Sequence, residues 1–272
     1  MNEIVVIGSG QAAIQTVMSL KRNKFTGSIK VIGEEDHLPY QRPPLSKDFL
    51  LEEYKPERVS LKKKEFYEEN EVDLILGKRA ESIDTILKEI TLSDENKIRY
   101  DQLIIATGSR VRKLNVPGSD KKGIYYLRDL DDANALKQRL KKNKKMVIVG
   151  AGYIGLEVAS VAASLGVEVT VIEMANRVMN RTVDPIISSY YQKLHESNGV
   201  KIHLDNGLKA FEGGDSVNAV LCSDGLMLEA DLVVIGAGVL PNQEIAIEAG
   251  LECNNGIMVN EFGETSTAHV YA

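Results

Sequence analysis

The sequence contains little cysteine and histidine, and neither residue type is spaced like a structural or metal-binding framework. Only Cys222 and Cys253 occur among 272 residues, and they form no C-x-x-C motif. This excludes a disulfide-stabilised scaffold and is typical of a reducing compartment. The four histidines show no metal-ligand spacing, so we expect the protein to hold no metal.

A basic excess and a long apolar run are also missing. Acidic residues outnumber basic ones by 39 to 33, giving a net charge of −6, which argues against nucleic acid as a partner because phosphate binding needs surplus cations. The most apolar stretch, residues 146–156, ends at Glu157 and is far shorter than the roughly 20 residues of a membrane span. Strand-like sequence begins at Ile4, and no targeting segment precedes it. We therefore expect a cytoplasmic protein without a membrane segment.

What the sequence does contain is an internal repeat. Residues 4–13 (IVVIGSGQAA) and 146–155 (MVIVGAGYIG) match at a constant offset. The paired turn positions are Gly8 and Gly150, Gly10 and Gly152, and Ala13 and Gly155. At roughly 150 residues per domain, the length also suggests two domains.

Each copy of the repeat continues in the same way. The expected elements are helices over residues 12–21 and 153–165 and strands over residues 29–34 and 169–173. Each strand ends in an acid, Glu34 or Glu173. A second pair of similar segments is 101–108 (DQLIIATG) and 231–238 (DLVVIGAG). This order predicts an α/β protein with two Rossmann-like, parallel-sheet domains.

Residues 72–100 and 201–228 depart from this pattern. They read as short strands separated by turn residues, such as those at positions 93–96. We expect them to form antiparallel β insertions.

The glycine-rich turns predict dinucleotide binding for steric and electrostatic reasons. The first glycine permits a tight turn, the second lets a pyrophosphate approach the backbone, and the third position packs helix against strand. The helix N-terminus then offers free N–H groups and a positive dipole end. A carboxylate after the second strand, Glu34 or Glu173, can accept the ribose hydroxyls. Two such units in one chain suggest electron transfer between a nicotinamide and a flavin.

One loop makes the pattern more specific. Residues 39–49 read PYQRPPLSKDF, and together with Ala106-Thr107-Gly108 and GVLPN at 238–242 they resemble the FAD-dependent ferredoxin reductases of Rieske oxygenase and P450 systems. The resemblance implies a glutathione-reductase-like fold. It assigns an FAD-binding domain to residues 1–112 and 240–272, with an NAD-binding domain at 113–239 inserted between them.

The resemblance also implies site residues. Those for FAD are Gly8, Gly10, Ala12, Glu34, Arg42, Lys47, Ala80, Ala106, Thr107, Gly108 and Arg128. Those for the nicotinamide cofactor are Gly150, Gly152, Ile154, Gly155, Glu157 and Glu173. Lys47 and Glu157 would pair beside the reacting rings in a catalytic role. From the residues alone, Lys47 also suits an exposed loop, Arg42 a surface ion pair, and Arg128 a structural salt bridge to a neighbouring aspartate.

The implied function is NADH-dependent reduction of a ferredoxin-like iron–sulfur protein through FAD. Two alternatives remain: the flavin module of a larger, nitrite-reductase-like enzyme, and a redox sensor resembling apoptosis-inducing factor. A disulfide reductase is disfavoured because no cysteine precedes Cys222, which follows an apolar run and is expected to be a buried strand thiol.

The last residues, 267–272, resemble the lead-in to the family's second flavin motif. The resemblance therefore implies a C-terminally truncated chain that holds FAD poorly compared with a longer version. The sequence leaves the oligomeric state and the identity of the electron acceptor open.

Overall fold

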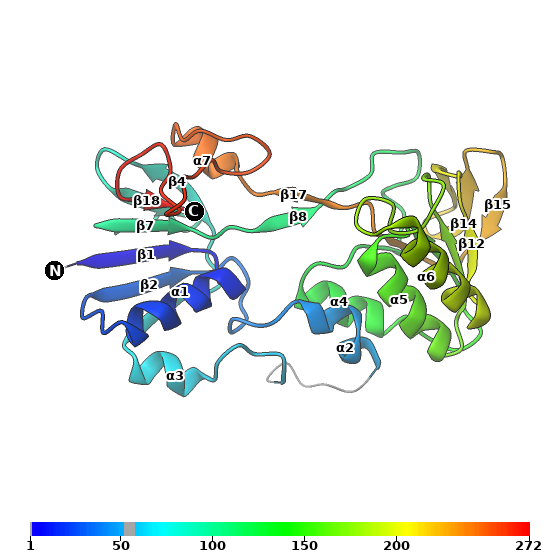
Figure 1. The fold of residues 1–272 in the computed structure, drawn as a ribbon, viewed down its shortest axis with the longest axis horizontal. Coiled ribbons are helices and arrows are strands. Elements are labelled where there is room, and N and C mark those ends of the chain that lie inside the picture. Colours follow the sequence, from blue (N-terminus) through cyan, green and yellow to red (C-terminus); the bar gives the residue numbers. More distant parts are fainter. Residues whose placement is uncertain (1, 52–57) are drawn as a thin grey trace. The chain divides into compact units, whose positions relative to one another are not determined.

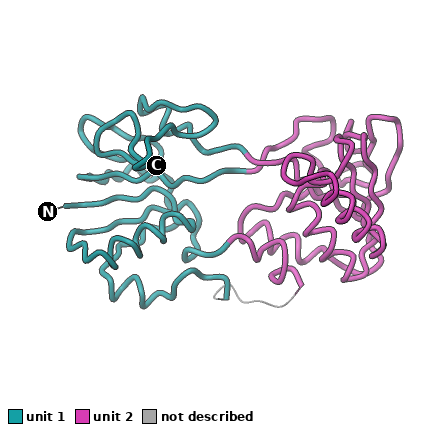
Figure 2. Tube along the Cα trace, in the orientation of Figure 1, with its two compact units in different colours: residues 1–41, 55–110, 240–272 teal, residues 42–54, 111–239 magenta. Residues whose placement is uncertain are grey.

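The computed structural model describes residues 2–51 and 58–272, which form two compact units (Figure 2). Among the described residues, the first unit contains 2–41, 58–110 and 240–272, and the second contains 42–51 and 111–239. The loop from Arg42 onward therefore packs with the second unit, although the sequence places it between elements of the first. These units are defined by contacts within the chain. Which cofactor each one binds stays a prediction. None of the described helices is both long enough and apolar enough to cross a membrane.

The first unit is built on a five-stranded parallel sheet (Figure 1). Its strands in spatial order are β18 (Val270–Tyr271), β7 (Gln102–Ile105), β1 (Glu3–Ile7), β2 (Ser28–Ile32) and β3 (Val72–Ile75). The helix α1 (Gln11–Arg22) joins β1 to β2 and buries Ala13, Ile14 and Val17 in a cluster with these strands. The short helix α3 (Lys64–Glu69) leads into β3. Near-continuous apolar runs such as Val5-Val6-Ile7 suit strands that are buried on both faces.

The second unit repeats this sheet. Its parallel strands in spatial order are β12 (Lys201–His203), β11 (Glu168–Ile172), β10 (Lys145–Val149), β16 (Leu232–Ile235) and β9 (Ile124–Tyr125). Its longer helices are α4 (Leu130–Lys137), α5 (Tyr153–Ser164) and α6 (Pro185–Ser197). Helix α6 begins with Asp184, whose side chain caps the Ile186 N–H, followed by a proline that is preorganised for the first turn.

Each unit also carries a three-stranded antiparallel sheet. These are β4 (Ala80–Asp84), β5 (Glu89–Leu92) and β6 (Lys97–Arg99) in the first unit, and β13 (Leu208–Gly213), β14 (Val217–Cys222) and β15 (Met227–Glu229) in the second. We expected all of residues 72–100 and 201–228 to form antiparallel insertions. That expectation is wrong for the first residues of each range, 72–75 and 201–203. Strands β3 and β12 continue the parallel sheets, because α3 and α6 precede them as crossover helices.

Two of the passages of the chain between the units lie in the paired strands β8 (Ser109–Val111) and β17 (Val239–Pro241). Beyond β17, the short helix α7 (Glu244–Glu248) returns to the first unit. Asn242 fastens this return: its backbone oxygen accepts from Thr107 Oγ1 at 2.6 Å, and its side-chain amide donates to the Thr107 backbone oxygen at 3.0 Å. The ATG motif is thus bonded to the last residue of GVLPN in the first unit.

Candidate functional site

The first glycine-rich turn has an open backbone at the start of a helix. Gly8 has φ +109°, and a Cβ there would lie 2.1 Å from the Ala106 backbone oxygen, so only glycine fits. Gly10 is the N-cap of α1, has no side-chain cap, and would have nothing within 4 Å of a Cβ. The first bond inside the helix runs from the Ile14 N–H to Gly10, so the preceding N–H groups have no partner within the helix.

The second turn has nearly the same geometry. Gly150 has φ +104°, and a Cβ there would lie 2.6 Å from the Gly236 backbone oxygen. Gly152 caps α5 with φ −79° and ψ −174°, against −81° and −170° at Gly10, and it too is surrounded by open space. Both turns therefore present unpaired N–H groups and the positive end of a twelve-residue helix to a space that side chains leave free.

The two turns differ at the third motif position. A Cβ at Gly155 would lie 2.1 Å from the Gly150 backbone oxygen, so α5 approaches its own turn too closely for alanine. The first unit has Ala13 at this position, fully buried, so α1 leaves room for a methyl group. One residue earlier, Ala12 and Ile154 are exposed beside the two turns.

The strands predicted over 29–34 and 169–173 end earlier, at Ile32 and Ile172, so the acids follow the strands. Glu34 and Glu173 are also not structural equivalents. The Glu173 N–H donates to His203 O at 2.9 Å, and in the first unit the matching bond runs from Gly33 to Ile75 O, also at 2.9 Å. Glu34 therefore lies one residue beyond the position of Glu173. A Cβ at Gly33 would lie 2.6 Å from Ser9 Oγ, so the turn's own serine fills the place of an acidic side chain.

Glu173 is bonded to its glycine-rich turn. Its Oε2 accepts from the Ala151 N–H at 2.7 Å, and its Oε1 accepts from the Ala175 N–H at 2.9 Å. Each carboxylate oxygen has a second lone pair for a ribose hydroxyl. Arg177 does not offset this charge directly, because its guanidinium donates elsewhere, to Val183 O, Ser188 Oγ and Asn180 O.

Glu34 has a more open environment. Its side chain is 70% exposed, and it lies 3.7 Å from Arg79, which is also largely exposed. A pair of this kind contributes little to stability, so the carboxylate is available to a ligand.

The loop with the sequence RPPLSK folds around Glu157 inside the second unit. Pro43 and Pro44 fix the backbone at the start of the 3-10 turn η1 (Pro43–Ser46), which continues into α2 (Asp48–Leu51). Lys47 Nζ lies 2.9 Å from Glu157 Oε1 and donates to Pro43 O at 3.1 Å. The structure thus brings together the two residues that the resemblance pairs. It adds Ser46, which the sequence analysis did not single out and whose hydroxyl donates to Glu157 Oε2 at 2.5 Å.

The remaining predicted residues of the flavin side fall into two groups. In the second unit, Arg42 Nη1 donates to the Arg128 backbone oxygen at 2.7 Å, and the Arg128 N–H donates to Asp132 at 2.9 Å. Burial, followed by repulsion from Asp129, raises the pKa of the Asp132 carboxyl above its ordinary value. In the first unit, Ala80 lies in the apolar core with its side chain almost covered, so any contact it makes with a ligand must come from its backbone.

The cysteines among the described residues do not form a redox or metal site. Cys222 is fully buried in β14, as expected, and burial, with a smaller contribution from Asp224, raises the pKa of its thiol. Burial also raises the pKa of the Cys253 thiol. Within residues 2–51 and 58–272, no three His, Cys, Asp or Glu side chains gather as metal ligands would.

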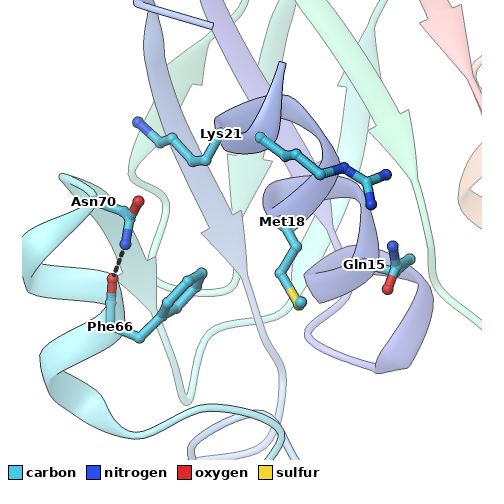
Figure 3. A pocket seen from close by; sticks show the side chains of 6 residues that line it. Gln15, Met18, Lys21, Phe66 and Asn70 are labelled. Carbon is cyan, nitrogen blue, oxygen red and sulfur yellow. Dashed lines mark hydrogen bonds between the residues drawn. The ribbon is translucent and has the colours of Figure 1, made fainter. Parts of the chain in front are cut away.

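A hollow of about 340 Å³ lies between α1 and α3 (Figure 3). It is lined by Gln15, Met18, Lys21, Arg22, Phe66 and Asn70, and therefore by none of the predicted cofactor residues. The Asn70 side-chain amide, at the C-terminal end of α3, donates to Phe66 O at 2.8 Å.

Comparisons with known proteins agree with this architecture. The family described as pyridine nucleotide-disulphide oxidoreductase matches residues 2–272. Rhodocoxin reductase of Rhodococcus erythropolis is 39% identical over 270 residues, which are 99% of this chain and 63% of that protein. Rubredoxin-NAD(+) reductase of Pseudomonas putida is 38% identical over 99% of this chain and 70% of that protein.

A solved structure gives the same result. The ferredoxin reductase for the CYP199A2 system of Rhodopseudomonas palustris superposes with a TM-score of 0.97 at 40% identity, over all of this chain and 67% of that one. The predicted fold class, two Rossmann-like dinucleotide-binding folds with antiparallel insertions, is confirmed. The chain spans about two thirds of the length of these relatives.

Proposed function

Because this chain belongs to the pyridine nucleotide-disulphide oxidoreductase family, we propose that it is the nucleotide-binding part of an NADH-dependent reductase that uses FAD to reduce a ferredoxin-like iron–sulfur protein. One observation carries the proposal: two parallel sheets in one chain each present an uncapped, glycine-opened helix N-terminus. Two such turns suit two dinucleotides, and a flavin with a nicotinamide is the pair that transfers electrons.

The residues present fit both cofactors. In the first unit, the open backbone at Gly8 and Gly10 would hold the FAD pyrophosphate, and the exposed Glu34 would accept ribose hydroxyls. Ala12, Ala80 and the Ala106-Thr107-Gly108 turn complete the proposed set there. Arg42, Lys47 and Arg128, which the resemblance implies for FAD, pack in the second unit. FAD supplies the change from two-electron to one-electron transfer when it is bound.

In the second unit, residues around the Gly150 turn would hold NADH. The N–H groups that follow Gly152 bind the pyrophosphate, Ile154 and Gly155 line the turn, and Glu173 accepts the ribose hydroxyls. Lys47 and Glu157 place one positive and one negative charge within 2.9 Å of each other. This pair would position the nicotinamide ring and adjust the charge around it. Hydride transfer between the two cofactors needs no protein nucleophile.

The proposed partner follows from the relatives and from the cysteines. The relatives are named as reductases of rhodocoxin, rubredoxin and ferredoxin. A disulfide substrate would need a reactive thiol, whereas both cysteines have thiols whose pKa is raised, which keeps them protonated. Direct electron transfer to a one-electron iron carrier, in the cytoplasm, fits this chain best.

The test uses the protein reconstituted with FAD. NADH should bleach the flavin absorbance in anaerobic stopped-flow, and the reduced protein should then reduce a 2Fe–2S ferredoxin. The double variant Cys222→Ser/Cys253→Ser should retain both steps. Failure of NADH to reduce the flavin, or loss of reduction in a folded, FAD-loaded double variant, would contradict the proposal.

A further inference from the structure

The RPPLSK loop contains a buried hydroxyl to which the proposed function gives no role. Ser46 is only 6% exposed and ends the turn η1. Its Oγ donates to Glu157 Oε2 at 2.5 Å, whereas its other acceptor, the Pro43 backbone oxygen, is 3.5 Å away. The bond to the carboxylate is short and charge-assisted, so it is the dominant interaction of this hydroxyl.

Ser46 and Lys47 hold different oxygens of one carboxylate. Lys47 Nζ contacts Glu157 Oε1 at 2.9 Å, and the Ser46 hydroxyl contacts Oε2. The Lys47 side chain is 47% exposed, and an ion pair with that much contact with water is weak and leaves both side chains free to rotate. A second donor from a buried, proline-fixed turn removes the rotation of the carboxylate.

We infer that Ser46 is a positioning residue, whose hydroxyl fixes the orientation of the Glu157 carboxylate and, through it, the place of the Lys47 ammonium. This inference rests on the proposed function, in which Lys47 and Glu157 act on the nicotinamide. The 3-10 turn makes the arrangement possible, because adjacent residues of one tight turn reach the same carboxylate on α5.

The first measurement separates binding from hydride transfer. With FAD-loaded protein, stopped-flow reduction at increasing NADH gives a limiting rate constant and an apparent Kd. Ser46→Ala should lower the limiting rate constant about tenfold, because a hydrogen bond to a charged group is worth about one decade or more, and should change the Kd less than about twofold. Ser46→Thr keeps a hydroxyl and should restore the rate, and Ser46→Cys, a weaker donor, should be intermediate.

A double-variant cycle tests whether the effect passes through Glu157. In the Glu157→Ala background, Ser46→Ala should change the rate constant little, because the acceptor of the Ser46 hydroxyl is already gone. Ser164→Ala is the matched control: Ser164 lies on the same helix, but its hydroxyl donates to Val161 O at 2.7 Å. An equal loss from Ser46→Ala with and without Glu157, or no loss in either, would overturn the inference.

A second readout does not depend on activity. Glutamate labelled with carbon-13 at its side-chain carboxyl gives an NMR signal for Glu157, assigned by its disappearance in Glu157→Gln. This signal should shift in Ser46→Ala, return in Ser46→Thr and stay unchanged in Ser164→Ala. An unshifted signal in Ser46→Ala would overturn the inference even if NADH reduces the flavin. Conversely, a shifted signal in a protein that NADH cannot reduce would leave the contact standing and refute the proposed function.

Discussion

The two units share one sheet order but form their nucleotide turns differently. In both, the strand before the glycine-rich turn lies between its βαβ partner and a strand that follows later in the chain: β2–β1–β7 in the first unit and β11–β10–β16 in the second. The strand beside β7 in the first unit is β18, which comes from the last residues of the sequence. The strand beside β16 in the second unit is β9, which precedes the second βαβ unit. One sheet order can thus be completed from either direction along the chain.

The difference closest to function is the strand-end residue. The second unit uses Glu173 to hold its own turn through the Ala151 N–H, whereas the first unit has Gly33 there and fills the space with Ser9. The first unit's acid, Glu34, is one residue further along and remains exposed. The turn of the second unit is therefore braced by a negative charge, and that of the first is not. This predicts different ligand selectivity at the two turns.

The largest expected effect tests that charge. A 2′-phosphate about 4 Å from Glu173 would cost about 4 kcal/mol at an effective dielectric near 20, so NADH should be preferred to NADPH by up to about a thousandfold in kcat/KM. Glu173→Gln removes the charge, keeps one acceptor for the Ala151 N–H, and should lower this preference at least about tenfold.

The control for this prediction is Glu34→Gln, which removes the exposed acid of the first unit. It should leave the ratio of kcat/KM values for the two cofactors unchanged. Equal use of NADPH by the unmodified protein, or an equal change in both variants, would refute the assignment of NADH to the second unit.

Much of this comparison could be read from the sequence, because the repeat keeps its glycines at a constant offset. Positions 8 and 150 must be glycine because φ is positive there and a backbone oxygen lies where a Cβ would be. A requirement of this kind can be read from single positions of the sequence. Counting residues places an acid near the end of each strand, Glu34 and Glu173, but does not show that the two acids occupy different positions. A side chain's direction depends on ladder register, which residue counting does not provide.

The candidate site could be predicted only in part. Lys47 and Glu157 are 110 positions apart, and neither periodicity nor propensity relates them; their pairing came from the resemblance alone. Ser46 was missed because its burial depends on the loop packing with the second unit, a long-range contact that no local pattern signals. The roles of these residues stay predictions until the variants are measured.

The second prediction concerns the third motif position. Gly155→Ala places a Cβ 2.1 Å from the Gly150 backbone oxygen, so α5 must shift, and we expect a loss of about 1–3 kcal/mol in the stability of the second unit together with weaker NADH binding. The reciprocal change, Ala13→Gly, should cost about 1 kcal/mol through helix propensity and leave FAD retention nearly unchanged. Hydrogen exchange followed by mass spectrometry measures each unit separately, and equal costs for the two changes would contradict the closer approach of α5.

The third prediction is a pH dependence confined to the second unit. His195 on α6 is 9% exposed, and burial lowers its pKa below the ordinary value of 6.5. The unfolded chain then binds the proton more readily, so the second unit loses stability as the pH falls below about 6.5, with a slope of at most about 1.4 kcal/mol per pH unit. His195→Gln should flatten this contribution, and an unchanged pH profile of hydrogen exchange in α6 would refute it.

The smallest expected effect lies where the crossover helices end. After α3 the chain reads Asn70-Glu71-Val72, and after α6 it reads Asn198-Gly199-Val200. The middle residue has positive φ in both, +51° at Glu71 and +85° at Gly199, which is the left-handed helix end that glycine adopts without strain. Nothing lies within 4 Å of a Cβ at Gly199, so a substitution there changes conformational energy alone.

Exchanging the two residues should therefore have opposite effects. Gly199→Glu should destabilise the second unit by about 1 kcal/mol, since a left-handed conformation costs an L-residue about that much. Glu71→Gly should stabilise the first unit by less, about 0.5 kcal/mol, because glycine also gives the unfolded chain more freedom. Gly199→Ala separates conformation from charge and should match Gly199→Glu. Denaturant unfolding followed by hydrogen exchange in each unit measures both changes. A stabilising Gly199→Glu, or a Glu71→Gly that destabilises by about 1 kcal/mol or more, would show that the helix ends are held by contacts of the side chains and not by backbone conformation.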